Sequence, residues 1–211
     1  ADKLVKVQLK DGKQRMILIH IEIQSYFERL FSRRMFLMNA YTIGRFDEDI
    51  VAIAIYTNAK TPKNFDRYER RAYGTETLFR FLAYKVMKQK EADLLASDNI
   101  LALFVLANKY TNETRGESNQ RKRLKLKEKL FELALAKQID LQKIQRLLIF
   151  VNNIMLLPLD LKTEFYEFIS NKAKKTPAMR NYIESNKELA NLFAHAVYGE
   201  TLEDIQKTRE Q

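Results

Sequence analysis

The sequence predicts an α/β protein, in which a small mixed sheet within about residues 1–90 is followed by a helical region over residues 91–211. Two observations support this fold class. A strand, a helix and a second strand follow one another within the first 56 residues, which is typical of a right-handed crossover between parallel strands. After residue 91, apolar residues recur three and four positions apart, as they do in helices.

Two strands joined by a hairpin are expected at the start of the chain. Residues 3–9 and 16–24 both alternate in polarity, which is the pattern of a strand with two different faces. Asp11-Gly12 between them is a turn signal, because glycine adopts a positive φ without steric cost. One face of the second strand is made of isoleucines and is expected to be the buried one. These residues are Ile17, Ile19, Ile21 and Ile23.

The opposite face of the second strand carries His20, Glu22 and Gln24. Because the apolar faces of both strands must coincide, the numbers of paired residues must have an even sum. A sum of 24 leaves a three-residue loop and sets Asp2 opposite Glu22, with Gln24 on the same face. Opposed residues have Cβ atoms roughly 5 Å apart. Two carboxylates at that separation favour Mg²⁺ or Mn²⁺, which activates water for attack on a phosphate.

These polar residues also have a structural interpretation. Glu22 and Gln24 would then face solvent beside a cross-strand lysine, and His20 would be a packed or hydrogen-bonded histidine. A Glu-x-Gln pair at the end of a strand does not by itself distinguish the two interpretations.

A helix is expected to start at Ser25 and to end at Gly44. Ser25 and Glu28 have the spacing of a capping box, in which each side chain bonds the backbone of the other residue. The apolar face of this helix is formed by Phe27, Leu30, Phe31, Met35 and Met38. Residues 50–56 are β-branched and predict a strand parallel to the second one.

Residues 57–77 contain Pro62 and Gly74 and are interpreted as a loop. Residues 77–87 fit an edge strand better than a helix. The helical region is then expected to contain helices over residues 98–110, 121–138, 140–156, 159–174 and 184–198. Asp140 and Asp160 are the expected N-caps of two of them, residues 111–120 form a loop, and Pro177 is a helix break.

Composition excludes several classes of function. The chain of 211 residues has no cysteine, which excludes disulfides and Cys-ligated metal centres, and its five glycines form no phosphate-binding or dinucleotide-binding loop. A formal charge of +10 favours an anionic partner, although many soluble proteins are basic without binding nucleic acid. The longest apolar run has eight residues, so no contact with a membrane and a cytoplasmic location are expected.

Several segments carry a family resemblance, in which the Asp2…His20-x-Glu22-x-Gln24 pattern is the most specific part. They are residues 2–7, 10–12, 17–24, 34–36, 51–57, 73–74, 79–81 and 94–99. In these segments the chain resembles the Rpn-type recombination-promoting nuclease/putative transposase family of the PD-(D/E)XK nuclease superfamily. The resemblance covers about residues 2–110. The remainder is helical, as in the family, but contains no specific motif.

This resemblance implies a restriction-endonuclease-like mixed sheet and a Mg²⁺-dependent (or Mn²⁺-dependent) endodeoxyribonuclease linked to recombination or transposition. Asp2 and Glu22 would be the metal-binding carboxylates. Gln24 would position the attacking water, at a place where many superfamily members carry lysine. The family normally has a helical segment ahead of Asp2, so we expect that the domain does not naturally start at Ala1, and that the sheet is bare near residues 1–8.

Basic residues that would contact DNA phosphates fall into two groups. Lys6, Arg33 and Arg34 lie near the expected site, and Arg121, Lys122 and Lys125 belong to the densest basic run. A solvated helix face is the more common explanation of the basic run, and surface solubility explains Lys6, Arg33 and Arg34 about as well as contact with phosphates. Two alternatives to the nuclease stay open. One is a catalytically inactive DNA- or protein-binding module on the same fold, and the other is a helical adaptor whose partner docks on residues 98–198.

Overall fold

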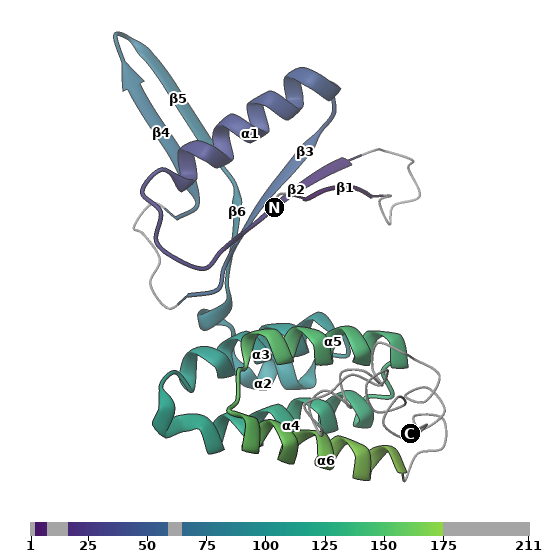
Figure 1. The fold of residues 1–211 in the computed structure, drawn as a ribbon. Helices are drawn as coiled ribbons and strands as arrows, with labels where there is room; N and C mark the ends of the chain where they lie inside the picture. Colours follow the sequence, from purple (N-terminus) through teal and green to yellow (C-terminus); the bar gives the residue numbers. More distant parts are fainter. Residues whose placement is uncertain (1–2, 8–16, 59–64, 175–211) are drawn as a thin grey trace, which may run out of the picture. The chain divides into compact units, whose positions relative to one another are not determined.

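The computed structural model describes residues 3–7, 17–58 and 65–174, without the side chains of residues 3–7, 173 and 174. The chain divides into two compact units, Ala1–Gln89 and Lys90–Gln211. The first contains a four-stranded sheet, a two-stranded hairpin and one long helix, and the second contains helices in its described part (Figure 1). The α/β class expected from the sequence is confirmed at this level.

The sheet of the first unit has the strand order β1-β2-β3-β6. Its strands are β1 (Lys3–Val7), β2 (Ile17–Gln24), β3 (Ile50–Tyr56) and β6 (Leu82–Lys85). The first pair is antiparallel, and β2, β3 and β6 are mutually parallel, so the predicted parallel crossover is confirmed. The predicted register is also confirmed, because Lys3 pairs with Ile21 and Val5 with Ile19, each with a sum of 24.

The crossover helix α1 (Phe31–Phe46) begins six residues later than predicted. The Ser25 and Glu28 capping box was wrong, since Glu28 instead accepts two hydrogen bonds from Arg34. A hydrogen bond between two charged groups is stronger than one between neutral groups. The helix also continues through Gly44 and ends where Asp47 takes a left-handed conformation, with φ of 49°. Phe27 and Leu30, expected on the apolar helix face, are exposed.

Helix α1 packs on the sheet face that carries the even-numbered residues of β2 and β3. The core of this unit is formed by Phe31, Met35, Ala52, Ala54, Tyr56 and Phe81. The expectation that the isoleucine face of β2 is the buried one was therefore wrong: Ile23 is 67% exposed, whereas Glu22 on the other face is 4% exposed. Helix α1 covers the sheet face on which β3 carries the small side chains of Ala52 and Ala54.

The predicted loop over residues 57–77 was wrong in its second half, which forms a hairpin. Strands β4 (Arg67–Ala72) and β5 (Thr75–Arg80) are antiparallel and are joined by the two-residue turn Tyr73-Gly74. Phe36 of α1 stacks on Tyr68 at 5.1 Å between ring centroids. The edge strand expected over residues 77–87 is in fact the end of β5, the edge strand β6 and the short 3₁₀ helix η1 (Val86–Lys88).

The helices of the second unit follow the sequence pattern closely. They are α2 (Glu91–Ala96), α3 (Leu101–Glu113), α4 (Gln120–Ala136), α5 (Leu141–Ile154) and α6 (Leu159–Lys174), with the 3₁₀ helix η2 (Glu117–Asn119) before α4. Asp140 caps α5 as predicted, accepting hydrogen bonds from the backbone N–H of Gln142 and Lys143. Asp160 lies within the first turn of α6, so its assignment as an N-cap was wrong.

The predicted loop over residues 111–120 is shorter than expected, because α3 extends to Glu113 and η2 follows. The break at Pro177 and the helix over residues 184–198 lie outside the described residues. Within residues 17–58 and 65–174, no helix has the length and apolar character needed to cross a membrane.

Candidate functional site

The candidate site is the polar end of β2, on the sheet face that α1 covers. His20, Glu22 and Gln24 are buried, with exposed fractions of 2%, 4% and 4%. In the parallel register His20 lies beside Ala52 and Glu22 beside Ala54, so the smallest apolar side chains flank the two polar ones. Burying three polar side chains on one face of a strand costs free energy unless each has a hydrogen-bond or ionic partner. The partners of these residues therefore indicate what the site can do.

The Glu22 carboxylate has two unlike oxygens. Oε2 accepts a 2.7 Å hydrogen bond from Nη2 of Arg34, while Oε1 lies 3.6 Å from Nε2 of His20. The other terminal nitrogen of Arg34 donates to both oxygens of Glu28, at 2.8 and 2.7 Å. The pKa of Arg34 is raised, chiefly by its hydrogen bond to Glu22, so the guanidinium is a fixed positive charge. Arg34 thus joins a buried carboxylate to a partly exposed one.

Three atoms of this site have no hydrogen-bond partner among the described residues. They are Oε1 of Glu22 and both ring nitrogens of His20, and each is buried. Most buried polar atoms in proteins are paired, so an unpaired one requires an explanation, such as an unseen water or ion. The Glu22 oxygen and the His20 imidazole, 3.6 Å apart without a hydrogen bond, each keep the capacity to bind a water molecule or a cation.

Gln24 is tied to the backbone beyond the end of β2. Its amide Nε2 donates to the carbonyl of Tyr26 at 2.7 Å. Gln24 lies beside Tyr56 of the neighbouring strand β3. The Tyr56 hydroxyl donates to the carbonyl of Phe65, and burial raises the pKa of that hydroxyl. The Gln24 side chain is therefore held in one orientation on the same face as Glu22.

Asp2 and the side chain of Lys6 lie outside the described residues. The described β1–β2 pairing ends at Lys3 and Ile21, so the pairing of Asp2 with Glu22 stays a prediction, as does a bare sheet near residues 1–8. Over the described part of the chain, no three histidine or acidic side chains form a cluster that could hold a metal. Of the two carboxylates predicted to bind the metal, the structure therefore describes Glu22 and not Asp2.

The basic residues predicted to contact DNA have different surroundings. Arg33 is exposed and has no acidic partner in the described structure, whereas Arg34 is engaged by Glu22 and Glu28. In the second unit, Arg121 pairs with Glu164 and Lys125 with Glu128. Lys122 is exposed on α4 without an acidic partner among the described residues. Arg33 and Lys122 are therefore the freest of these cations.

The sequence interpretation missed the bond between Arg34 and Glu22. Arg34 had been assigned only to phosphate contacts, and Glu28 to a helix cap. The signal that could have revealed the pair is Ala52 and Ala54, which share the parity of Glu22 on the neighbouring strand and allow the close approach of a helix.

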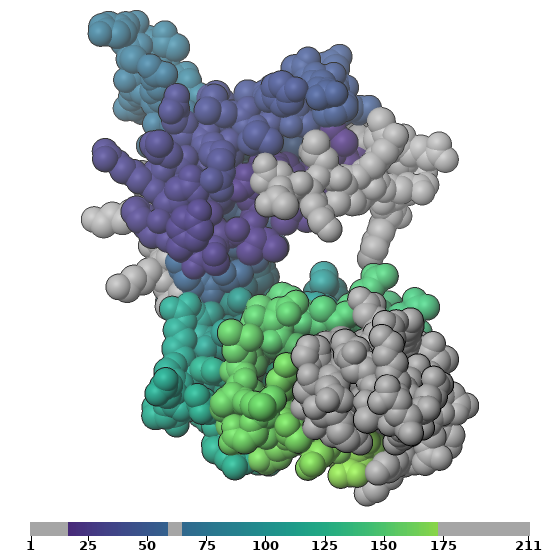
Figure 2. Space-filling model, viewed as in Figure 1, coloured from purple at the N-terminus to yellow at the C-terminus, as the bar shows by residue number. Residues whose placement is uncertain are grey.

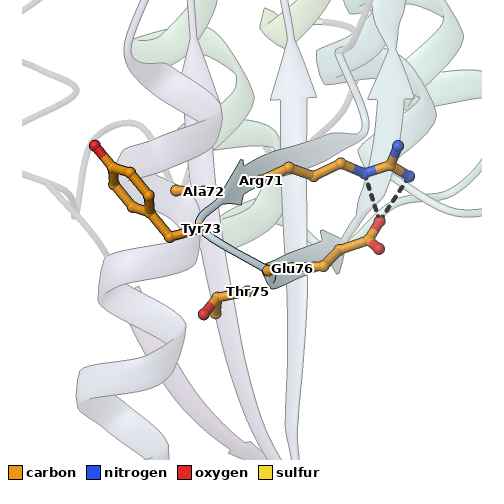
Figure 3. Close-up of a pocket in the computed structure, with 6 residues that line it drawn as sticks. Arg71, Ala72, Tyr73, Thr75 and Glu76 are labelled. Carbon is orange, nitrogen blue, oxygen red and sulfur yellow. Dashed lines mark hydrogen bonds and ion pairs between the residues drawn. The ribbon is translucent and has the colours of Figure 1, made fainter.

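An open pocket of about 460 Å³ lies elsewhere in the first unit, at the turn of the β4–β5 hairpin. It is lined by residues 71–76 alone, which are the Tyr73-Gly74 turn and the strand ends on either side of it (Figure 3). Because no element outside this hairpin forms a wall, this hollow is not an enclosed site for a small molecule.

Comparison of the chain with protein-family models, with curated proteins and with solved structures gives no match.

Proposed function

We propose that this protein is a metal-dependent DNA endonuclease of the PD-(D/E)XK type, which hydrolyses phosphodiester bonds on a restriction-endonuclease-like core. A role in recombination or transposition follows from the family resemblance. The observation that supports the proposal most is the Glu22 carboxylate, which is 4% exposed and has one oxygen unpaired among the described residues. An unpaired, buried carboxylate oxygen does not stabilise a fold, whereas a metal-dependent phosphodiesterase uses such an oxygen to bind its cation.

The residues present fit a divalent cation at this position. Oε1 of Glu22 is an unpaired, buried carboxylate oxygen, and hard oxygen ligands suit Mg²⁺ and Mn²⁺. Glu22 would hold the ion together with Asp2, which the hairpin register predicts on the same face. The bound cation would polarise the phosphate and lower the pKa of a water molecule.

The protein's own residues have distinct roles in this proposal. Arg34 holds Oε2 and balances the charge of the carboxylate, so that the other oxygen keeps one orientation. Gln24, on the same face, orients the attacking water through its neutral amide. Arg33 is exposed and has no acidic partner in the described structure, so it is available to a DNA phosphate.

A plasmid-nicking assay with Mg²⁺ or Mn²⁺ tests the proposal. Glu22→Gln keeps the shape and still accepts a hydrogen bond from Arg34, but it removes the charge that binds the cation. Cleavage is expected to fall by about 100-fold or more, while DNA affinity measured in EDTA holds or rises slightly. Glu28→Gln is the matched control, because Glu28 also pairs with Arg34 but lies on no strand. Equal cleavage by the wild type and Glu22→Gln would remove the catalytic assignment.

A second candidate is a catalytically inactive binding module on the same fold. The ion pair between Arg34 and Glu22 favours it, because a guanidinium 2.7 Å from the carboxylate opposes a second cation there. This candidate predicts salt-dependent DNA binding without nicking at any concentration of Mg²⁺ or Mn²⁺.

A further inference from the structure

The β4–β5 hairpin, residues 67–80, is a two-stranded ribbon that is attached to its unit at one end only. Near the open end of the ribbon, Tyr68 and Phe79 pack on Phe36 of α1, with ring centroids 5.1 and 5.9 Å apart. The turn end projects beyond α1 and the four-stranded sheet in Figure 1, and the same projection stands out from the first unit in Figure 2. The ribbon is therefore anchored by aromatic packing and presents its turn to solvent.

Tyr73 at the turn contributes nothing to the packing of the described structure. It is fully exposed, makes no ring contact with a described residue, and points away from the ion pair of Arg71 with Glu76 (Figure 3). Its φ is 50° and that of Gly74 is 77°, as a type I′ turn requires. Asparagine or glycine suits the first of these positions, and a bulky side chain is strained there. A strained, exposed aromatic residue at the end of a projection points to a partner.

The charges of the ribbon are predominantly positive. It carries four arginines and two glutamates. Arg67 pairs with Glu69 and Arg71 with Glu76, so both glutamates are compensated within the ribbon. Arg70 and Arg80 are exposed and have no acidic partner in the described part of the chain. Arg80 also lies directly opposite Arg67 in the strand register, an arrangement of like charges that an anion would relieve.

We infer that this ribbon enters the major groove of duplex DNA, with Tyr73 at its leading end and with Arg70 and Arg80 on phosphates. The inference rests on the proposed function for the identity of the partner. Paired strands lie roughly 5 Å apart, and the major groove of B-form DNA, about 12 Å wide, admits a two-stranded ribbon. The free arginines supply the phosphate contacts that fix a ribbon in the groove.

Binding of a different partner by the ribbon would give different results. A protein partner that adds a strand to an open edge of the hairpin would bind through the backbone and would be insensitive to Arg70 and Arg80. Duplex RNA has a deep and narrow major groove that a ribbon cannot enter. The groove-binding inference therefore requires preference for B-form DNA over duplex RNA of the same sequence.

The experiment measures binding of the full chain to a labelled 20-base-pair DNA duplex by fluorescence anisotropy, in EDTA so that nothing is cleaved. Tyr73→Asn removes the aromatic ring and places a residue that suits the turn. Arg70→Gln with Arg80→Gln removes both free charges. The control double variant is Lys143→Gln with Arg146→Gln, which removes two exposed cations of α5 that have no acidic partner among the described residues.

We expect the arginine double variant to lose about tenfold in affinity at low salt, with a salt slope smaller by about two, since each phosphate contact contributes roughly 0.9. Tyr73→Asn is expected to lose about threefold or more, because the ring no longer makes apolar contact with base edges in the groove. The α5 control should bind like the wild type. Thermal unfolding of each variant verifies that the fold is intact, and Tyr73→Asn should be at least as stable as the wild type.

Two results would overturn the inference. One is wild-type affinity in both ribbon variants, and the other is equal or tighter binding of duplex RNA. Either result leaves the proposed nuclease untouched if the plasmid is still nicked in a Glu22-dependent way. Weakened binding by the ribbon variants together with no nicking by the wild type would instead support the ribbon and remove the nuclease.

Discussion

The guanidinium of Arg34 donates a 2.7 Å hydrogen bond to the buried carboxylate of Glu22, which lies twelve residues earlier in the chain. This bond connects the first turn of α1 to the end of β2, across the buried face of the sheet. Glu22 is nearly inaccessible, whereas the Arg34 side chain is 42% exposed, so Arg34 is the solvent-facing partner of an internal charge.

Removing the Arg34 guanidinium should destabilise the first unit. Arg34→Met leaves Glu22 charged and unpaired, and we expect a loss of about 2 kcal/mol in the free energy of unfolding. This is below the loss typical of a fully buried pair because Arg34 is partly exposed. Urea unfolding at neutral pH measures it. Arg33→Met, one position earlier and exposed without an acidic partner in the described structure, should change stability by less than about 0.5 kcal/mol. Equal effects of both variants would show that the pair carries no stability.

The two candidate helix caps should respond differently to alanine. Asp140 accepts hydrogen bonds from two backbone N–H groups, so Asp140→Ala should cost about 1 kcal/mol. Ser25 lies six residues before the start of α1, and Ser25→Ala should change stability by only a few tenths of a kcal/mol. Thermal unfolding compares the two variants, and a large loss in Ser25→Ala would contradict the observed start of α1.

Lys127 should make the second unit less stable at neutral and acidic pH. Its side chain is 2% exposed, over the ring of Phe165 at 4.6 Å, and burial together with the charges of Lys162 and Arg123 lowers its pKa to about 7. The unfolded chain binds more protons than the folded one between pH 7 and about 10.5, so stability rises with pH across that window. The slope approaches about 1.4 kcal/mol per pH unit. Below pH 7 the cost of burying the charge is present in full.

Lys127→Met tests this origin of the pH dependence. The variant is expected to be more stable than the wild type at pH 7 and to lose most of the rise in stability between pH 7 and 9.5, as followed by urea unfolding. Lys122→Met is the control, since Lys122 is exposed on the same helix. If the stability of Lys127→Met rose with pH as much as that of the wild type, the pH dependence would come from other groups.

A hydrogen bond between α3 and α2 should contribute stability at neutral pH. The hydroxyl of Tyr110 donates to a carboxylate oxygen of Glu91 at 2.6 Å, and this bond is the main reason that the pKa of Glu91 is lowered. The stabilisation is therefore present above the unfolded pKa of about 4.5 and is lost as pH falls through the lower folded value. Tyr110→Phe is expected to lose about 1 kcal/mol at pH 7 and less at pH 3. Chemical unfolding at both pH values provides the check, and an equal loss at both would exclude the carboxylate as the cause.

Sequence periodicity alone determined most of the local structure. Alternation in β1 and β2, together with a three-residue loop between them, was sufficient for the register that pairs Val5 with Ile19, because a slip by one residue would turn every side chain to the other face. Helical spacing and the Asp140 cap likewise located α5, since both depend on residues close together in the chain. The strands of the β4–β5 hairpin were missed because their many charged residues obscure the alternation, although Tyr73-Gly74 has the form of a two-residue turn.

Only the tertiary structure decided which face of β2 is covered. The pattern of β2 separates isoleucines from polar residues, but it does not say which set meets a helix. That choice follows from the docking of Phe31 and Met35 on the side of Ala52 and Ala54, which buries Glu22. The bond from Arg34 to Glu22 depends in turn on this docking, because the two residues lie on different elements. Such contacts between elements have no period in the sequence, and they are decided by which surfaces pack together.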